Sequence, residues 1–291
     1  MDNSLGIAVA TGSFKGVFAH GVLAAFESAG LEASAYACAS SSVISSTLTA
    51  IGAAQSVGLA YWREALRIAQ ESHQDMSHVV KRSIQIYGPM IKRQLFCGGR
   101  RRILIYVSAV NNEAAAAVTQ GDGARRLGRR LLLDAFRGDS RWAQENLDKV
   151  CFDSRPDEHG LALTERNFDD VVYASTRMLH AWKQPAWVEG KPYVDASYTC
   201  MCPAYELCAK GYGEVLAIGT EPGPQFADIF RTRVIKDSLI GATRLRTILP
   251  DCDLKTLGVD FTEATDGGLE AAFRHGYEKG LAFAAAYEKG E

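Results

Sequence analysis

The sequence predicts an α/β fold with a mostly parallel central sheet covered by helices. Two strand–turn–helix units open the chain, over residues 5–30 and 35–52. This alternation is typical of parallel sheets whose faces carry helices. The composition agrees, because 47% of the 291 residues are hydrophobic and 23% are charged, as in an ordinary globular protein.

The two units follow the same plan. The apolar residues 5–10 predict a short strand, the polar residues 11–16 a glycine-bearing loop, and the apolar spacing that follows a helix stopping at Gly30. Residues 35–39 predict a second strand of small residues, which runs directly into a helix over residues 41–50. The carboxyl ends of both strands therefore carry short, chemically interesting turns.

The rest of the chain continues the alternation. The remaining elements are expected, in order, as amphipathic helices within 53–98, a buried strand over 102–109, amphipathic helices within 112–150, a helix capped by Thr164 or Asn167 and reaching 179, a hairpin over 185–194 turning at 189–191, a buried strand over 214–219 and a helical tail over 262–289. No repeat or composition break divides the chain. We therefore expect one domain over 1–291, with residues 112–165 as its lid or insertion.

Charge and cysteine content exclude several classes. Lys plus Arg is 32 and Asp plus Glu is 34, so the net charge of -2 argues against a nucleic-acid partner. Seven cysteines without a CxxC motif indicate reduced thiols and a cytoplasmic location. The sequence has no run of 18 apolar residues, so we expect no membrane-spanning helix, and we expect no signal peptide. Asp251 and Asp253 are too few for a calcium site, so we expect no metal and no cofactor.

Basic clusters at 100–102 and 125–130 have two interpretations. They form solvated faces, or they meet anionic lipid head groups as a peripheral membrane contact together with Trp142, Trp182 and Trp187.

Three turns could carry chemistry. Gly12, Ser13, Phe14, Lys15 and Gly16 lie between a strand and a helix, where backbone N–H groups suit a phosphate or an oxyanion. The alternative is a plain strand-to-helix turn that needs glycine. A dinucleotide loop is disfavoured, because no tyrosine is followed four residues later by lysine, as short-chain reductases require.

The second and third turns hold a serine and an aspartate. Ser40 lies where the second strand meets its helix, a junction that can expose a serine Oγ beside helix N–H groups. The alternative is an N-cap. Asp195 follows a predicted strand, where a carboxylate can act as a general base or simply stabilise a turn.

Together the three turns resemble the patatin-like phospholipase family. That family has a glycine-rich loop ending in Arg/Lys-Gly, a G-x-S-x-G elbow and a distant D-G-G/A, here matched by Lys15-Gly16, Ser40 and Asp195. Residues 5–52 and 168–220 carry the resemblance. It implies a three-layer α/β/α sandwich, a lipid or acyl-ester substrate, and a Ser40–Asp195 dyad without histidine, whose oxyanion is held by the 12–16 loop and Ser41.

The resemblance also shows departures. Glycine is missing at 13, 14, 38, 42, 196 and 197, and Ser41 and Ser42 compete with Ser40 for the role of nucleophile. His180 is kept as a reserve base. We expect a serine esterase or lipid acyl hydrolase. An acyltransferase using the same acyl-enzyme and a non-catalytic acyl-binding protein are the alternatives.

Overall fold

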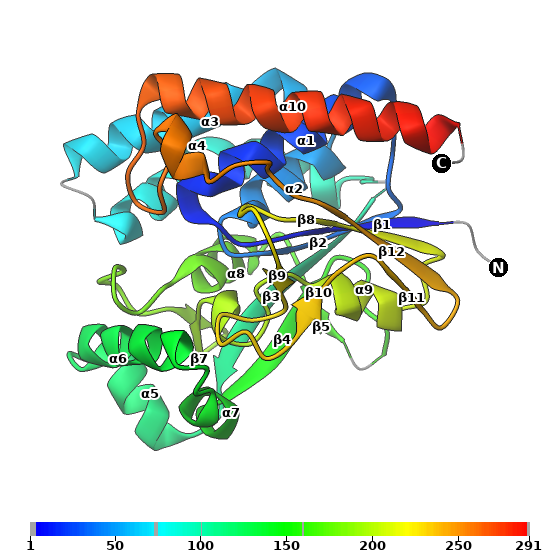
Figure 1. The fold of residues 1–291 in the computed structure, drawn as a ribbon. Helices are drawn as coiled ribbons and strands as arrows, with labels where there is room; N and C mark the ends of the chain where they lie inside the picture. Colours follow the sequence, from blue (N-terminus) through cyan, green and yellow to red (C-terminus); the bar gives the residue numbers. More distant parts are fainter. Residues whose placement is uncertain (1–3, 73–74, 100, 159, 290–291) are drawn as a thin grey trace.

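The computed structural model describes residues 4–72, 75–99, 101–158 and 160–289 (Figure 1). They form an α/β fold in which a mixed, mostly parallel central sheet is flanked by helices. The predicted α/β class and the parallel pairing of the first two strands are confirmed.

The central sheet has the order β11-β12-β8-β1-β2-β3-β4-β5. Its parallel part comprises β12 (Thr243–Ile248), β8 (Glu214–Ile218), β1 (Leu5–Val9), β2 (Ala35–Ala39) and β3 (Arg102–Val110). At one end the sheet finishes with β11 (Ser238–Ile240), which is antiparallel to β12. At the other end β4 (Leu147–Asp153) is antiparallel to β3, and β5 (Leu161–Ala162) is parallel to β4. Strands β1 and β2 are buried along their whole length, as expected for a sheet covered on both faces.

Most helices lie on one face of this sheet (Figure 1). That layer contains α1 (Gly16–Ala29), α2 (Ser42–Ala50), α3 (Ala54–Glu71), α4 (Met76–Phe96) and α10 (Asp266–Glu288), while α8 (Phe168–Thr176) packs against α4 and β3. The short α9 (Ala204–Ala209) packs against β1 and β8 through the separate apolar core on the other face. Helix α1 ends as predicted, with Gly30 in the left-handed region.

Helices α1 and α10 touch backbone to backbone. A Cβ on Gly21 would lie 2.1 Å from the carbonyl oxygen of Phe273, and one on Gly276 would lie 2.0 Å from that of Phe18. No side chain fits at either position. Glycine therefore sets the distance between two helices that are far apart in the sequence.

The region 112–165 is part helix and part sheet. Helices α5 (Glu113–Gln120), α6 (Ala124–Phe136) and α7 (Arg141–Asn146) contribute to a third, smaller apolar core, which also contains Leu147, Leu179 and Phe230. The helix expected to reach 150 was wrong beyond 146, because residues 147–153 pair with β3 instead. A pairing partner distant in sequence thus overrides local periodicity.

The hairpin before Asp195 forms as predicted. Strands β6 (Trp187–Val188) and β7 (Lys191–Val194) are joined through Glu189 and Gly190, both at positive φ. Strand β7 also pairs with the end of β3 at Ser108 and Ala109. This pairing brings Asp195 to the carboxyl-end edge of the sheet.

Two predicted helix ends were wrong, and several short elements complete the fold. Helix α8 stops at Thr176 rather than 179, and α10 begins after Thr265, whose Oγ1 accepts the Gly268 N–H. The short elements are β9 (Gln225–Phe226), β10 (Val234–Ile235) and the 3₁₀ turns η1 (Ser13–Lys15), η2 (Ala196–Tyr198) and η3 (Leu254–Leu257).

Candidate active site

Ser40 occupies a sharp turn between β2 and α2. Its φ is 55°, a left-handed conformation that serine adopts at a cost of about 1–3 kcal/mol. The side chain is nearly buried, at 7% exposure. A left-handed serine between a strand and a helix is the backbone arrangement expected for a nucleophile elbow.

The neighbouring positions accept side chains in place of glycine. Cys38 points into the apolar core and is fully buried. The Ser42 hydroxyl accepts the Ala39 N–H at 3.0 Å, and its own proton is shared between the carbonyl oxygens of Ala39 at 2.8 Å and Val9 at 3.0 Å. Ser42 thus ties the elbow to β1, so this hydroxyl is a structural group rather than a nucleophile.

Ser175 is a positioning residue that the sequence did not reveal. Its Oγ accepts the N–H of Ser40 at 2.8 Å and donates to the Tyr106 carbonyl at 2.7 Å. The hydroxyl therefore connects the elbow to β3 and α8. An Ala-Ser-Thr sequence inside a helix carries no signal for this role, which exists only through contact between distant segments.

Asp195 lies beside Ser40. The Ser40 hydroxyl donates to Asp195 Oδ2 at 2.8 Å, and the second oxygen, Oδ1, accepts the Ser197 N–H at 2.7 Å. Backbone bonds fix the aspartate, since its N–H donates to Arg177 O and its carbonyl accepts from Ser108 Oγ. The two predicted residues are thus brought together in a direct hydrogen bond.

Burial changes the acidity of this carboxyl group. Asp195 is fully buried, and desolvation raises its pKa from 3.8 to about 6 against the opposing effect of hydrogen bonds from Ser197 and Ser40. The group is still ionised at neutral pH, but it is a stronger base than an exposed carboxylate. A raised pKa is what proton abstraction from a hydroxyl requires.

The loop over residues 12–16 lies against the elbow. Its Gly12 N–H donates to Ser41 Oγ at 3.2 Å. The N–H groups of Phe14, Lys15 and Gly16 donate to backbone carbonyls, that of Phe14 to Phe261. Four of the expected oxyanion-site N–H groups are therefore already occupied.

Two of the six N–H groups predicted for the oxyanion site are left without a protein acceptor among the described residues. Those of Ser13 and Ser41 donate to no protein acceptor in the described parts of the chain, and both residues line the same cavity as Ser40. Ser41 follows the elbow serine, where a helix N-terminus presents its N–H groups. Two free donors from a loop and an elbow form the pattern of an oxyanion hole.

Lys15 fixes the 12–16 loop through ion pairs with two other loops. Its Nζ lies 2.7 Å from Glu221 Oε1 and 3.1 Å from Asp253 Oδ1, and it sits over the Phe261 ring. These partners come from the loops after β8 and β12. Although burial opposes its charge, the two carboxylates raise the pKa of Lys15, so it stays a cation.

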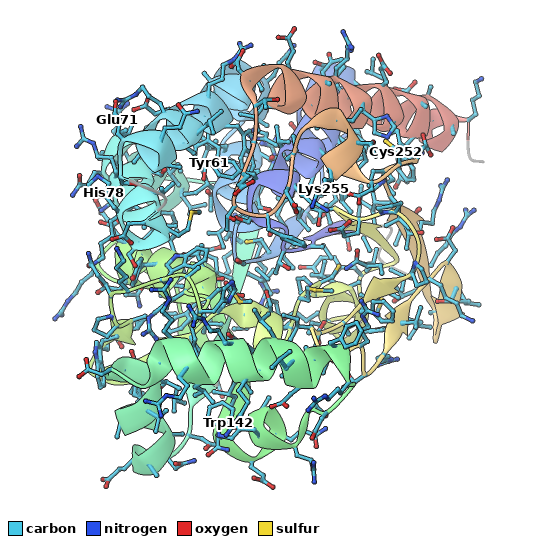
Figure 2. All side chains as sticks on the ribbon, turned by 60° about the vertical axis from the view of Figure 1, so that its left-hand side comes forward. Tyr61, Glu71, His78, Trp142, Cys252 and Lys255 are labelled. Atoms are coloured by element: carbon cyan, nitrogen blue, oxygen red, sulfur yellow. The ribbon has the colours of Figure 1, made fainter. Side chains whose placement is uncertain are left out.

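A narrow apolar cavity of about 50 Å³ leads from Ser40 between the helices. Figure 2 labels Tyr61, one of its lining residues, in the helical layer. The lining consists of Ser13, Phe14, Ser40 and Ser41 at the elbow, followed by Ile44, Tyr61, Trp62, Ala65, Met76, Val79, Val80, Ser83, Ile84, Val172, Thr176 and Trp182. Such a lining suits an apolar group, because it presents few polar groups.

Among the residues that the structure describes, no histidine hydrogen-bonds to Ser40 or Asp195. His20 is buried, accepts from Trp62 Nε1 at Nδ1 and has its pKa lowered to about 4 by burial. His275 packs on Phe18 and accepts the Asp251 N–H. His180 bonds to neither member of the pair within the described residues. The carboxylate of Asp195 is thus the titratable group in direct contact with the serine.

The basic clusters have different surroundings. Arg100 lies outside the described residues, while Arg101 and Arg102 pair with Glu32 and Asp153. Arg125 and Arg129 of α6 form no ion pair within the described residues and face a surface hollow. No helix of the described parts is long and apolar enough to cross a membrane.

No protein-family model and no curated protein matches this chain.

Proposed function

We propose that this chain is a serine acyl hydrolase of the patatin-like type, which cleaves a fatty acyl ester through an acyl-enzyme on Ser40. The observation that carries the proposal is the 2.8 Å hydrogen bond from the strained Ser40 to the fully buried Asp195. A nucleophile in contact with a base of raised pKa is the minimal apparatus for covalent acyl transfer.

The proposed reaction has two half-steps. Ser40 Oγ attacks the ester carbonyl while its proton moves to Asp195, and the N–H groups of Ser13 and Ser41 stabilise the oxyanion. The intermediate collapses, the proton passes to the departing alkoxide, and the acyl group remains on Ser40. In the second half-step Asp195 takes a proton from the water that attacks the acyl-enzyme. The tetrahedral intermediate then collapses and releases the acid, while the proton passes from Asp195 to Ser40 Oγ.

An acyltransferase shares the first half-step. The burial of Asp195 and the apolar cavity favour this second candidate, because a dry acyl-enzyme survives until an alcohol or amine reaches it. Measuring the products with and without an added alcohol separates the two. Free acid in both cases indicates hydrolysis, and a new ester indicates transfer.

The direct test uses a fluorophosphonate probe. We expect the wild-type chain to be labelled once and Ser40→Ala to remain unlabelled. Ser41→Ala is the matched control, because Ser41 Oγ accepts from Gly12 rather than contacting Asp195. Labelling lost in Ser41→Ala but kept in Ser40→Ala would refute the assignment. Folded but unlabelled wild-type protein would favour a non-catalytic acyl-binding function.

A further inference from the structure

The apolar cavity beside Ser40 is small. Its volume is about 50 Å³, whereas an apolar protein cavity that holds one benzene ring has a volume of about 150 Å³. The cavity therefore has room for roughly two to four non-hydrogen atoms. With the ester carbonyl at Ser40, these atoms are the part of the acyl group beyond the carbonyl. A short acyl group fits this space, and a long chain does not.

Buried contacts fix the aromatic wall of the cavity. Trp62 lines the cavity, and its Nε1 donates to His20 Nδ1 at 2.9 Å. Because Nδ1 is the acceptor, the proton of the neutral imidazole lies on Nε2, which donates to the Ala54 carbonyl oxygen at 3.1 Å. The Trp62 ring also packs edge-on against Tyr61, at 4.9 Å between the ring centroids. Widening the cavity on this side would break a buried hydrogen bond.

Two side chains of the lining carry buried polar atoms without partners. Ser83 Oγ on α4 and Trp182 Nε1 in the loop after α8 form no hydrogen bond of good geometry within the described residues. Ser83 is 2% exposed and Trp182 is 7% exposed. Buried polar groups in proteins are nearly always hydrogen-bonded, so these two atoms point to a bound group that carries an oxygen.

The chemistry of the lining narrows that group to a neutral one. An indole N–H only donates, while a serine hydroxyl both donates and accepts, so a hydroxyl oxygen can bond to either. Burial, followed by Tyr87, raises the pKa of the lining phenol Tyr61 against the effect of nearby Ser83, so the phenol stays un-ionised. The described lining residues include no charged side chain. A carboxylate on the acyl group would therefore be buried without a counter-ion.

We propose that this cavity binds a short hydroxylated acyl group, such as 3-hydroxybutanoyl, so that the chain acts on esters of short hydroxy acids. The inference rests on the proposed acyl-ester activity for the reaction and on the cavity for the acyl group. It narrows the fatty acyl group of that proposal to a short one. The acyl carbonyl lies at Ser40, the carbon atoms contact the apolar wall, and the hydroxyl bonds to Ser83 Oγ with Trp182 Nε1 as a second donor.

Binding to the Ser40→Ala protein tests this without requiring turnover. Titrations followed by tryptophan fluorescence report on the cavity, because Trp62 and Trp182 line it. The first pair of probes is ethyl 3-hydroxybutanoate and ethyl 3-methylbutanoate, which have nearly the same shape and differ by a hydroxyl against a methyl group. We expect the hydroxy ester to bind roughly two- to tenfold more tightly, the range of one net hydrogen bond.

Ethyl octanoate tests the length limit. Its hydrophobicity alone predicts tighter binding than that of either short ester. We expect it to bind roughly tenfold more weakly than the hydroxy ester, because extra methylenes do not fit a closely packed site. Ile84→Ala widens the cavity and should recover this binding. Ile91→Ala is the control, since Ile91 is buried on the same helix but lies outside the cavity lining.

Ser83→Ala, added to Ser40→Ala, should abolish the preference for the hydroxy ester over the methyl ester. Ser46→Ala is the matched control, because Ser46 Oγ is also buried without a partner among the described residues but lies outside the cavity lining. Circular dichroism checks the folding of each variant. Where a variant does not fold, the comparison of the three esters in the Ser40→Ala protein still decides.

Three results would overturn the inference. These are ethyl octanoate binding as tightly as the hydroxy ester, equal binding of the hydroxy and methyl esters, and a preference that survives Ser83→Ala or is lost equally in Ser46→Ala. The binding result is independent of the fluorophosphonate result. An unlabelled wild-type protein whose Ser40→Ala form prefers the hydroxy ester would refute the hydrolase and retain the acyl site. A labelled protein without this preference would retain the hydrolase and refute the acyl site.

Discussion

Replacing Asp195 with asparagine should stabilise the protein at neutral and alkaline pH while strongly lowering its activity. Burial raises the pKa of this carboxyl group from 3.8 to about 6. At about 1.36 kcal/mol per pKa unit, the ionised native state is less stable by up to about 3 kcal/mol than it would be with a neutral group. Asparagine removes the charge at nearly constant shape.

The sign of the pH dependence follows from proton counting. Between pH 3.8 and about 6 the native state holds a proton that the unfolded chain has lost, so wild-type stability falls as the pH rises through this window. The stabilisation that comes from this native-state proton is fully present below pH 3.8, the pKa of the group in the unfolded chain. Asp195→Asn lacks this term, so its advantage should be largest at pH 8 and close to zero at pH 4.

Urea unfolding at pH 4, 6 and 8 measures this difference. Asp148→Asn, on the exposed side of β4, is the control and should show no such trend. We expect a gain of about 1–3 kcal/mol at pH 8, because the amide forms weaker hydrogen bonds than the carboxylate. A variant less stable than wild type at pH 8, or a gain independent of pH, would refute the assignment of a destabilising buried charge.

The same change tests the dyad. Loss of the base should lower kcat/KM roughly 10²- to 10⁴-fold. In the wild type, kcat/KM should rise with pH through about 6, as Asp195 ionises. Activity retained by Asp195→Asn would exclude the aspartate as the base.

Three further substitutions probe the support of the site. Ser175→Ala leaves the buried N–H of Ser40 without its acceptor, so we expect slower fluorophosphonate labelling and a free energy of unfolding in urea that is lower by about 1–3 kcal/mol. Ser175→Thr should restore both, and unchanged labelling in Ser175→Ala would contradict the positioning role. Ser42→Gly, although it restores a family glycine, removes the hydroxyl that ties the elbow to β1, and should cost about 1–2 kcal/mol in the same assay; a more stable variant would show that the hydroxyl is dispensable. Gly276→Ala forces apart α1 and α10 and should lower Tm by several degrees, whereas Gly267→Ala, which meets open space, should not; equal melting of the two would contradict the close packing.

The sequence could locate the elbow serine and the aspartate because both follow strands of one sheet. Carboxyl ends of neighbouring parallel strands share an edge, so order along the chain already brings Ser40 near the 12–16 loop. The hairpin that delivers Asp195 was readable from its turn residues. These signals come from residues close together in the chain, so they can be recognised in a single sequence.

What the sequence could not supply depends on distant contacts. Ser175 acts through a bond to Ser40 that spans 135 residues. The N–H of Phe14 is occupied by the carbonyl of Phe261, which leaves Ser13 and Ser41 as the available donors. The strand over 147–153 exists because β3 offers it a partner. Each fact requires knowing which segments meet.

The Ser40–Asp195 bond joins residues 155 positions apart, with more than half of the chain between them. A partly synthesised or misfolded chain contains the serine but has no base beside it. Reactivity toward a fluorophosphonate should therefore appear late, once β7 has paired with β3 and delivered the aspartate. The probe then labels molecules in which the aspartate is in place, so the time course of labelling after dilution from urea would report when β7 joins β3.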